Sequence, residues 1–160
     1  MTGGPAAPLA RYAPWVRRGD FVFLSGVVPL DPALGRVVRG FADLPPGVPE
    51  TIGATGEFSA DAKDGPILAQ SWFVLDRVRA TIEDAGGTMA DVFRLVQYFT
   101  DLDHFPRYNA VRRGFFPDAP PVSTVVQVSG LMPTAEVLIE VEATAWLPLG
   151  RLRELERPSG

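Results

Sequence analysis

Two stretches of the sequence decide the fold: Pro120-Pro121-Val122-Ser123-Thr124-Val125-Val126-Gln127-Val128 and Glu136-Val137-Leu138-Ile139-Glu140-Val141-Glu142-Ala143-Thr144-Ala145-Trp146. Both are rich in β-branched residues and have a period of two, which is typical of β-strands. The break at Gly130-Leu131-Met132-Pro133 predicts a short turn between them. Successive side chains of a strand point to opposite faces, so the second strand places Glu140 and Glu142 on the same face. One of these carboxylates is a candidate for a functional site.

The rest of the chain predicts a mixed sheet with two helices. The expected elements are strands over residues 21–29, 36–38 and 91–100, a helix from Pro66 to the stop signal at Ala85-Gly86-Gly87, and a helix over residues 104–115. Gly26 interrupts the first strand, and a residue without a Cβ lets another group approach closely. A strand–helix–strand connection requires parallel neighbours, whereas the end hairpins are antiparallel. The predicted fold is therefore an α+β domain, with a mixed β-sheet and both helices on one of its faces.

The segment between Gly40 and Pro66 breaks this pattern. It contains several prolines and glycines and shows no periodicity, so an irregular insertion loop over residues 40–66 is predicted, either a functional flap or a mobile insertion. The charged stretch over residues 149–160 is predicted to be a frayed polar tail. Residues 1–148 then form a single domain, as expected for a chain of 160 residues of which 46% are hydrophobic.

The composition excludes several classes of protein. The chain has no cysteine and one histidine, His104, so disulfides, a thiol nucleophile and cysteine or multi-histidine metal sites are excluded. A metal site built from carboxylates alone stays open, but no motif predicts a metal or a cofactor. A net charge of -4 and the lack of long arginine or lysine clusters argue against a nucleic-acid partner. Neither a signal-peptide pattern nor an apolar run of about 20 residues is present, so no membrane partner and a cytoplasmic location are expected.

Several short motifs occur in a characteristic order along the chain. They are Tyr12, residues 19–26 with Asp31-Pro32, residues 83–87 ahead of Asp91-Val92, residues 99–105, Tyr108-Asn109, Phe115-Phe116, Pro120-Pro121, and Leu131 followed by residues 139–143. Together they resemble the RidA/YjgF family of small enamine and imine deaminases. The resemblance spans residues 11–147 apart from the segment 40–66. It implies a chorismate-mutase-like fold and a homotrimer with small-molecule pockets between neighbouring subunits.

The resemblance also implies a set of site residues. Glu140 matches the acidic residue that holds the attacking water in the family, and a carboxylate in a partly apolar pocket is a suitable general base. The pocket residues that match are Tyr12, Ser25, Gly26 and Asn109. Each also has a structural interpretation: Tyr12 as a packing aromatic, Asn109 as a helix hydrogen-bonding residue, and Ser25-Gly26 as a feature of the backbone.

The chain departs from the family pattern at Ser123. Members that deaminate carry an arginine at this position, and its guanidinium binds the substrate carboxylate. A neutral hydroxyl cannot form that bidentate pair, so imines derived from amino acids are expected to bind poorly. Thr124 and Val125 follow, and the pocket formed with Ser123 is expected to suit a neutral or differently charged ligand. The sheet face carrying Ser123, Val125 and Gln127 is expected to be covered by a neighbouring subunit.

Three functional hypotheses follow. The leading one is a RidA-type hydrolase that adds water to a reactive imine, an enamine or a related carbonyl derivative, with Glu140 activating the water and a substrate unlike the usual one. The second is a non-catalytic trimeric binding or interaction protein that has lost the arginine. The third is a member recruited to a specialised biosynthetic pathway. The older family label of endoribonuclease fits the acidic composition poorly.

Overall fold

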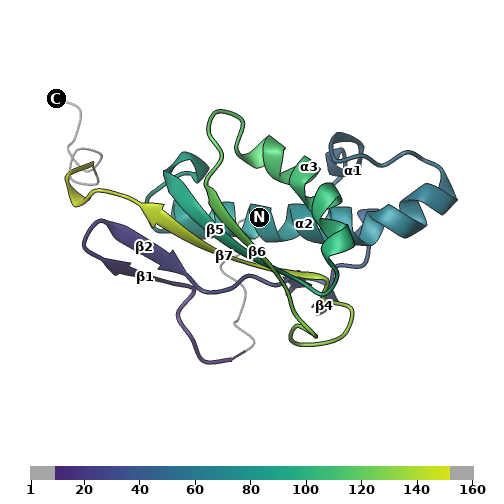
Figure 1. Ribbon diagram of the computed structural model, residues 1–160, viewed down its shortest axis with the longest axis horizontal. Coiled ribbons are helices and arrows are strands. Elements are labelled where there is room, and N and C mark those ends of the chain that lie inside the picture. Colours follow the sequence, from purple (N-terminus) through teal and green to yellow (C-terminus); the bar gives the residue numbers. More distant parts are fainter. Residues whose placement is uncertain (1–9, 152–160) are drawn as a thin grey trace.

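The computed structural model describes residues 10–151, which fold around one five-stranded sheet (Figure 1). Its strands, in spatial order, are β1 (Trp15–Arg18), β2 (Phe21–Leu24), β7 (Ile139–Trp146), β5 (Val92–Phe99) and β6 (Val122–Gln127). Among the described residues, only the β5–β6 pair is parallel, and β2 and β5 both run antiparallel to β7. β7 is therefore the central strand, and β6 is a free edge. The predicted α+β architecture with a mixed sheet is confirmed.

Two long helices, α2 (Phe58–Asp84) and α3 (Phe105–Phe115), share one core with the sheet. In β7 the alternate residues Ile139, Val141 and Ala143 are buried in that core, as period-two burial requires. α2 ends as predicted from its glycines: Gly86 has a φ of 89°, and the Gly87 N–H donates to the carbonyl of Ile82 at 2.9 Å. This left-handed glycine stop turns the chain back toward the sheet.

The segment 40–66 is not the irregular loop that its composition predicts. It contains a turn of 3-10 helix, η1 (Phe41–Asp43), a short helix, α1 (Val48–Thr51), and the first nine residues of α2. Pro66 lies inside α2 and does not start it. The polar residues of α2 before Pro66 extend beyond the core, so no apolar periodicity predicts that they are helical. The start of the helix is instead held by the Asp61 carboxylate, which accepts from the backbone N–H groups of Thr55 and Gly56.

Part of this segment forms a second, smaller core with α2. Leu44 and Val38 are buried together with Ala69 and Phe73, and the ring of Phe41 packs beside them. Val38 follows the small hairpin of β3 (Leu30–Asp31) and β4 (Arg36–Val37). The segment is thus anchored to α2 and is not a detached flap.

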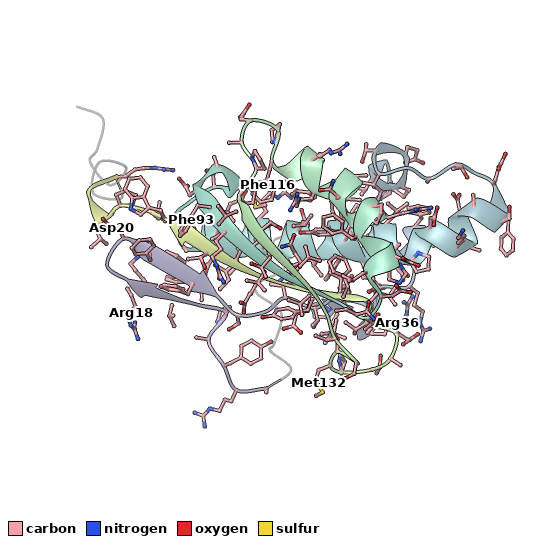
Figure 2. The ribbon with its side chains drawn as sticks, in the orientation of Figure 1. Arg18, Asp20, Arg36, Phe93, Phe116 and Met132 are labelled. Carbon is pink, nitrogen blue, oxygen red and sulfur yellow. The ribbon has the colours of Figure 1, made fainter. Side chains whose placement is uncertain are left out.

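The face of the sheet opposite the helices is open and apolar. Its exposed side chains come from β1, β2, β5, β6 and β7, and they are Val16, Phe21, Phe23, Phe93, Val122, Val126 and Trp146. Phe93, labelled in Figure 2, lies edge-on to Phe21 with 6.0 Å between ring centroids. Ser123, Val125 and Gln127, whose face is expected to be covered by a neighbouring subunit, are not part of this open face: they pair with the buried Leu95, Gln97 and Phe99 and lie on the helix side.

The two ends of the chain extend beyond the described residues. Residues 152–160 of the predicted tail lie outside the described residues, as do residues 1–9 of the predicted domain. Arg151, at the start of that tail, pairs with Asp91 just before β5. None of the helices between residues 10 and 151 is long and apolar enough to cross a membrane.

The second core leads to a prediction about stability. Leu44→Ala should lower the free energy of unfolding by about 2–4 kcal/mol, because truncating a buried leucine removes its contacts and leaves a cavity. Leu34→Ala, at a leucine that is 41% exposed, is the matched control and should change it by less than about 0.5 kcal/mol. Urea denaturation measures both. Equal effects for the two variants would mean that the segment around Leu44 does not pack as described.

Candidate functional site

A cavity of about 330 Å³ opens on the helix-free side of the sheet, near the start of β7. Its lining residues are Ala10, Tyr12, Ser25, Gly26, Val28, Met132 and Glu140. Met132, labelled in Figure 2, extends from the loop between β6 and β7. The structure thus brings together Glu140, Tyr12, Ser25 and Gly26, four of the predicted site residues from three separate parts of the chain.

Gly26 and Glu140 are in close contact because the chain after β2 pairs with β7. Val27 and Val141 exchange two backbone hydrogen bonds of 2.8 and 3.0 Å, which hold Gly26 beside Glu140. A Cβ on Gly26 would lie 2.0 Å from Oε1 of Glu140 and 2.9 Å from its Cδ. Only glycine leaves the carboxyl group this position, which is the close approach predicted from the break in the first strand.

The environment of Glu140 favours its protonated form. Burial against the cavity raises the pKa of the Glu140 carboxyl, and the negative charge of Glu142 on the same face raises it further. Burial and the charges of Glu142 and Glu140 also raise the pKa of Tyr98, which lies opposite Glu140 on the neighbouring strand β5. A carboxyl group with a raised pKa can take up and release a proton closer to neutral pH than an ordinary glutamate.

Ser25 and Tyr12 have different roles in the cavity wall. The Ser25 hydroxyl donates to the backbone carbonyl of Ala13 at 2.7 Å, and the Ser25 N–H donates to that of Pro14 at 3.0 Å. These two hydrogen bonds of Ser25 hold the segment before β1 against the end of β2. Tyr12 lies on this segment and is 42% exposed, so its ring is accessible to a ligand in the cavity.

Ser123 and Asn109 lie in a second cluster on the helix side of β6, away from the face that carries Glu140. The Ser123 hydroxyl is 3.0 Å from Nε2 of the buried Gln97 and 3.1 Å from a guanidinium nitrogen of Arg112. The side-chain oxygen of Asn109 accepts from Arg112 at 2.9 Å. Within one chain, these two predicted residues do not reach the Glu140 cavity.

Thr124 and Val125, the other two predicted site residues, point to opposite sides of β6. Val125 packs against the main core on the helix side. Thr124 lies on the open face, and its carbonyl accepts from Nε2 of Gln97 at 2.9 Å. They do not line a single pocket with Ser123.

Sequence reasoning missed Gln97, Arg112 and Met132. The sequence does indicate Gln97, because it is the one amide among the apolar residues of β5 that face the core. A buried polar side chain needs hydrogen-bonding partners, so such a residue points to a polar cluster. Arg112 is three residues after Asn109 on α3, which places both on one face of the helix. Met132 carried no signal beyond its place in the predicted turn.

Comparison with known proteins identifies the family. The sequence model described as Endoribonuclease L-PSP matches residues 48–147. A RutC family protein of Pyrococcus horikoshii is 30% identical over 146 residues, which cover 91% of this chain and 94% of that protein. The chain therefore belongs to this family, the RidA/YjgF family, as its motifs indicated.

Three further relatives are informative. The 3-aminoacrylate deaminase RutC of Acinetobacter baylyi is 28% identical over 142 residues, covering 89% of this chain and 91% of that protein. A solved structure of a putative endoribonuclease from Klebsiella pneumoniae is 64% identical, with a TM-score of 0.84, and covers 86% of this chain and 100% of that one. RidA from an Antarctic Psychrobacter, 24% identical with a TM-score of 0.67 over 89% of this chain and 93% of its own, shares the fold.

The contact between Gly26 and Glu140 can be tested directly. Gly26→Ala should displace the flexible end of Glu140 into solvent, because the new methyl group takes the place of the carboxyl oxygen. The pKa of Glu140, followed by NMR titration, should then fall toward its ordinary value of 4.5. Gly40→Ala is the control, because a Cβ at Gly40 meets nothing within 4 Å. An unchanged titration in Gly26→Ala would contradict the described contact.

Proposed function

We propose that this protein hydrolyses the C=N bond of a small imine, or of an enamine after its conversion to the imine. The oxygen of water adds to the imine carbon while Glu140 takes one of the water protons. That proton passes to the nitrogen and gives a carbinolamine. Glu140 then moves the hydroxyl proton of the carbinolamine to its amine nitrogen, the carbon–nitrogen bond breaks, and a carbonyl compound and ammonia leave. The reaction consumes one water and needs no oxidant, reductant or metal.

The position of the Glu140 carboxyl group in the cavity wall, together with its raised pKa, is the observation that carries this proposal. This group lies against a cavity of a size suited to a small molecule, and burial together with Glu142 raises its pKa. Raised basicity favours proton abstraction from water, and the same group can return the proton to nitrogen. Membership of a family that includes a relative named 3-aminoacrylate deaminase supports the same chemistry.

The complete site is proposed to lie between subunits of a homotrimer. The Glu140 cavity opens on the apolar open face, while Ser123 and Asn109 lie beside the free edge of β6. A neighbouring copy that covers the open face can bring its own β6 edge to this cavity, so each site takes one part from each of two chains. Phe21, Phe23 and Trp146 would then be buried, as an apolar surface of this extent favours.

Hydrolysis of RNA is less well supported by the same residues. The cavity carries a carboxylate with a second one nearby, and these repel a phosphodiester. His104, the single histidine of the sequence, lies in the turn η3 (Leu102–His104) and does not line this cavity. We therefore do not propose ribonuclease activity for this chain, although its family model and several relatives carry the name endoribonuclease.

Replacing Glu140 tests the chemical step. Glu140→Gln should keep the fold, since the amide is nearly isosteric, and should lower kcat for ammonia release by at least about a hundredfold. The assay uses a panel of small imines and enamines, with and without a carboxylate, including 3-aminoacrylate. In the wild type, kcat/KM should fall as the pH drops through the pKa of Glu140, which lies above its ordinary value of 4.5, because the base must be ionised.

Glu142→Gln is the matched control for that experiment. Burial, the main cause of the raised pKa of Glu140, remains in this variant, but the charge of Glu142 that raises it further is removed. Activity should therefore persist while the acid limb of the pH profile moves to lower pH. If Glu140→Gln turns over as fast as the wild type, Glu140 is not the base. If no member of the panel releases ammonia with the wild type, the non-catalytic binding protein is the better description.

The assembly has its own test. Light scattering at micromolar concentration should give three times the chain mass of 17.3 kDa for the wild type. Phe23→Asp should shift the protein to monomers, because it places a charge in the proposed interface. Phe58→Asp is the matched control, because Phe58 is 88% exposed at the start of α2, away from the open face, and it should leave the trimer intact. A monomeric wild type would overturn the shared site.

A further inference from the structure

The guanidinium of Arg112 is held in a fixed position at the edge of the sheet by three neutral side chains. One nitrogen donates to Oε1 of Gln97 at 3.2 Å and to the Ser123 hydroxyl at 3.1 Å, and the other donates to Oδ1 of Asn109 at 2.9 Å. The carbon of the group also lies 5.9 Å from the ring centre of Tyr108, which is fully buried. These contacts connect the last turn of α3 to β5 and β6.

None of these contacts neutralises the charge of Arg112. Within residues 10–151, five other arginines form ion pairs with carboxylates: Arg36 with Asp43, Arg39 with Glu136, Arg79 with Asp76, Arg107 with Asp64 and Arg151 with Asp91. Arg112 has no such partner among the same residues. Its half-buried guanidinium is held by neutral groups alone, so an anion that binds there does not have to displace a carboxylate of the described part of the chain.

Arg112 also has hydrogen-bonding capacity to spare. A guanidinium has five N–H donors, and the three contacts leave two of them, including that on Nε, without an acceptor in the described part of the chain. Two N–H groups of one planar guanidinium match the two oxygens of a carboxylate. Because Gln97, Ser123 and Asn109 already fix the orientation of the group, little side-chain entropy remains to be lost when an anion binds.

A purely structural role explains less of this arrangement. Cations near a helix C-terminus interact favourably with its dipole, and both Arg112 and Arg113 lie in the last turn of α3. Arg113 supplies that effect from an exposed position, so the dipole alone does not call for the fixed guanidinium of Arg112. A clamp between α3 and β6 could be built from neutral amides, which would avoid the uncompensated charge.

We propose that Arg112 binds the carboxylate of the substrate and thereby selects anionic imines or enamines over uncharged ones. This inference rests on the proposed function and its shared site, in which the β6 edge of one subunit meets the Glu140 cavity of the next. The substrate carboxylate would bind Arg112 of one chain, and its C=N bond would lie at Glu140 of the other. Ser123 then positions Arg112, and the cation that the sequence lacks in β6 is supplied from α3.

Binding of pyruvate and of its uncharged amide, pyruvamide, tests the inference without turnover. The two probes share size and the ketone and differ mainly in charge. Calorimetry or ligand-observed NMR on the whole protein should show that the wild type binds pyruvate at least tenfold more tightly than pyruvamide. In Arg112→Gln this preference should fall by about ten- to a hundredfold, the range that hydrogen bonds to a charged group supply. A wild type without the preference would overturn the inference.

Two further variants separate recognition from folding. Arg113→Gln removes the same charge from the same helical turn and should keep the preference for pyruvate. Arg112→Lys keeps the charge but loses the planar fork, so it should restore part of the preference even if Arg112→Gln folds poorly. If Arg112→Gln folds normally and retains the full preference, or if Arg113→Gln loses it equally, then Arg112 is not the anion-binding residue.

Glu140→Gln distinguishes failure of this inference from failure of the proposed function. With a carboxylate-bearing imine, Arg112→Gln should raise KM by about ten- to a hundredfold with a smaller change in kcat, whereas Glu140→Gln should lower kcat. Pyruvate preference that depends on Arg112 in a protein without turnover would support the inference and overturn the hydrolase. Turnover that depends on Glu140 but has the same KM in Arg112→Gln would support the hydrolase and overturn the role of Arg112.

Discussion

The alternation of side chains along β7 is the constraint on which the rest of the structure depends. This central strand pairs with β2 on one side and with β5 on the other. Val141 and its neighbours two residues away fill the core under α2 and α3, and this burial leaves Glu140 and Glu142 on the opposite face. A shift of one residue in register would bury both carboxylates, so the strong apolar selection for one face also fixes where the acids lie.

The position of Glu140 is unfavourable for an ordinary surface carboxylate. Its charged form is partly desolvated and lies near Glu142, and both effects raise its pKa. Gly26 gives it this position, because any larger residue there would occupy the space of its carboxyl oxygen. Environments that disfavour the charged form of a single acid are typical of proton-transfer sites, where basicity serves function at some expense of stability.

The arrangement also explains why the proposed site would require two chains. Glu140 opens on the apolar face, whereas Ser123 and Arg112 lie on the helix side of a free edge strand. Within one protomer the sheet itself separates Glu140 from Ser123 and Arg112, because side chains on opposite sides of a sheet cannot reach each other through its hydrogen-bonded backbone. In the proposed trimer, a second copy placed over the open face would cover its aromatic residues and would bring the two groups of side chains together. Assembly and function would then depend on the same surface.

The strands around Glu140, both long helices and the close approach at Gly26 follow from local patterns: a period of two, a helical period, and a glycine inside a strand. Those patterns do not reveal the early start of α2, whose first turns lie beyond the core and are polar. Nor do they reveal the contact between Arg112 and Ser123. Local periodicity reports which side of an element is buried, so the sequence by itself determined the fold and the place of Glu140. Only the tertiary structure decided which distant side chains meet, because the guanidinium reaches Ser123 through the packing of α3 against the sheet.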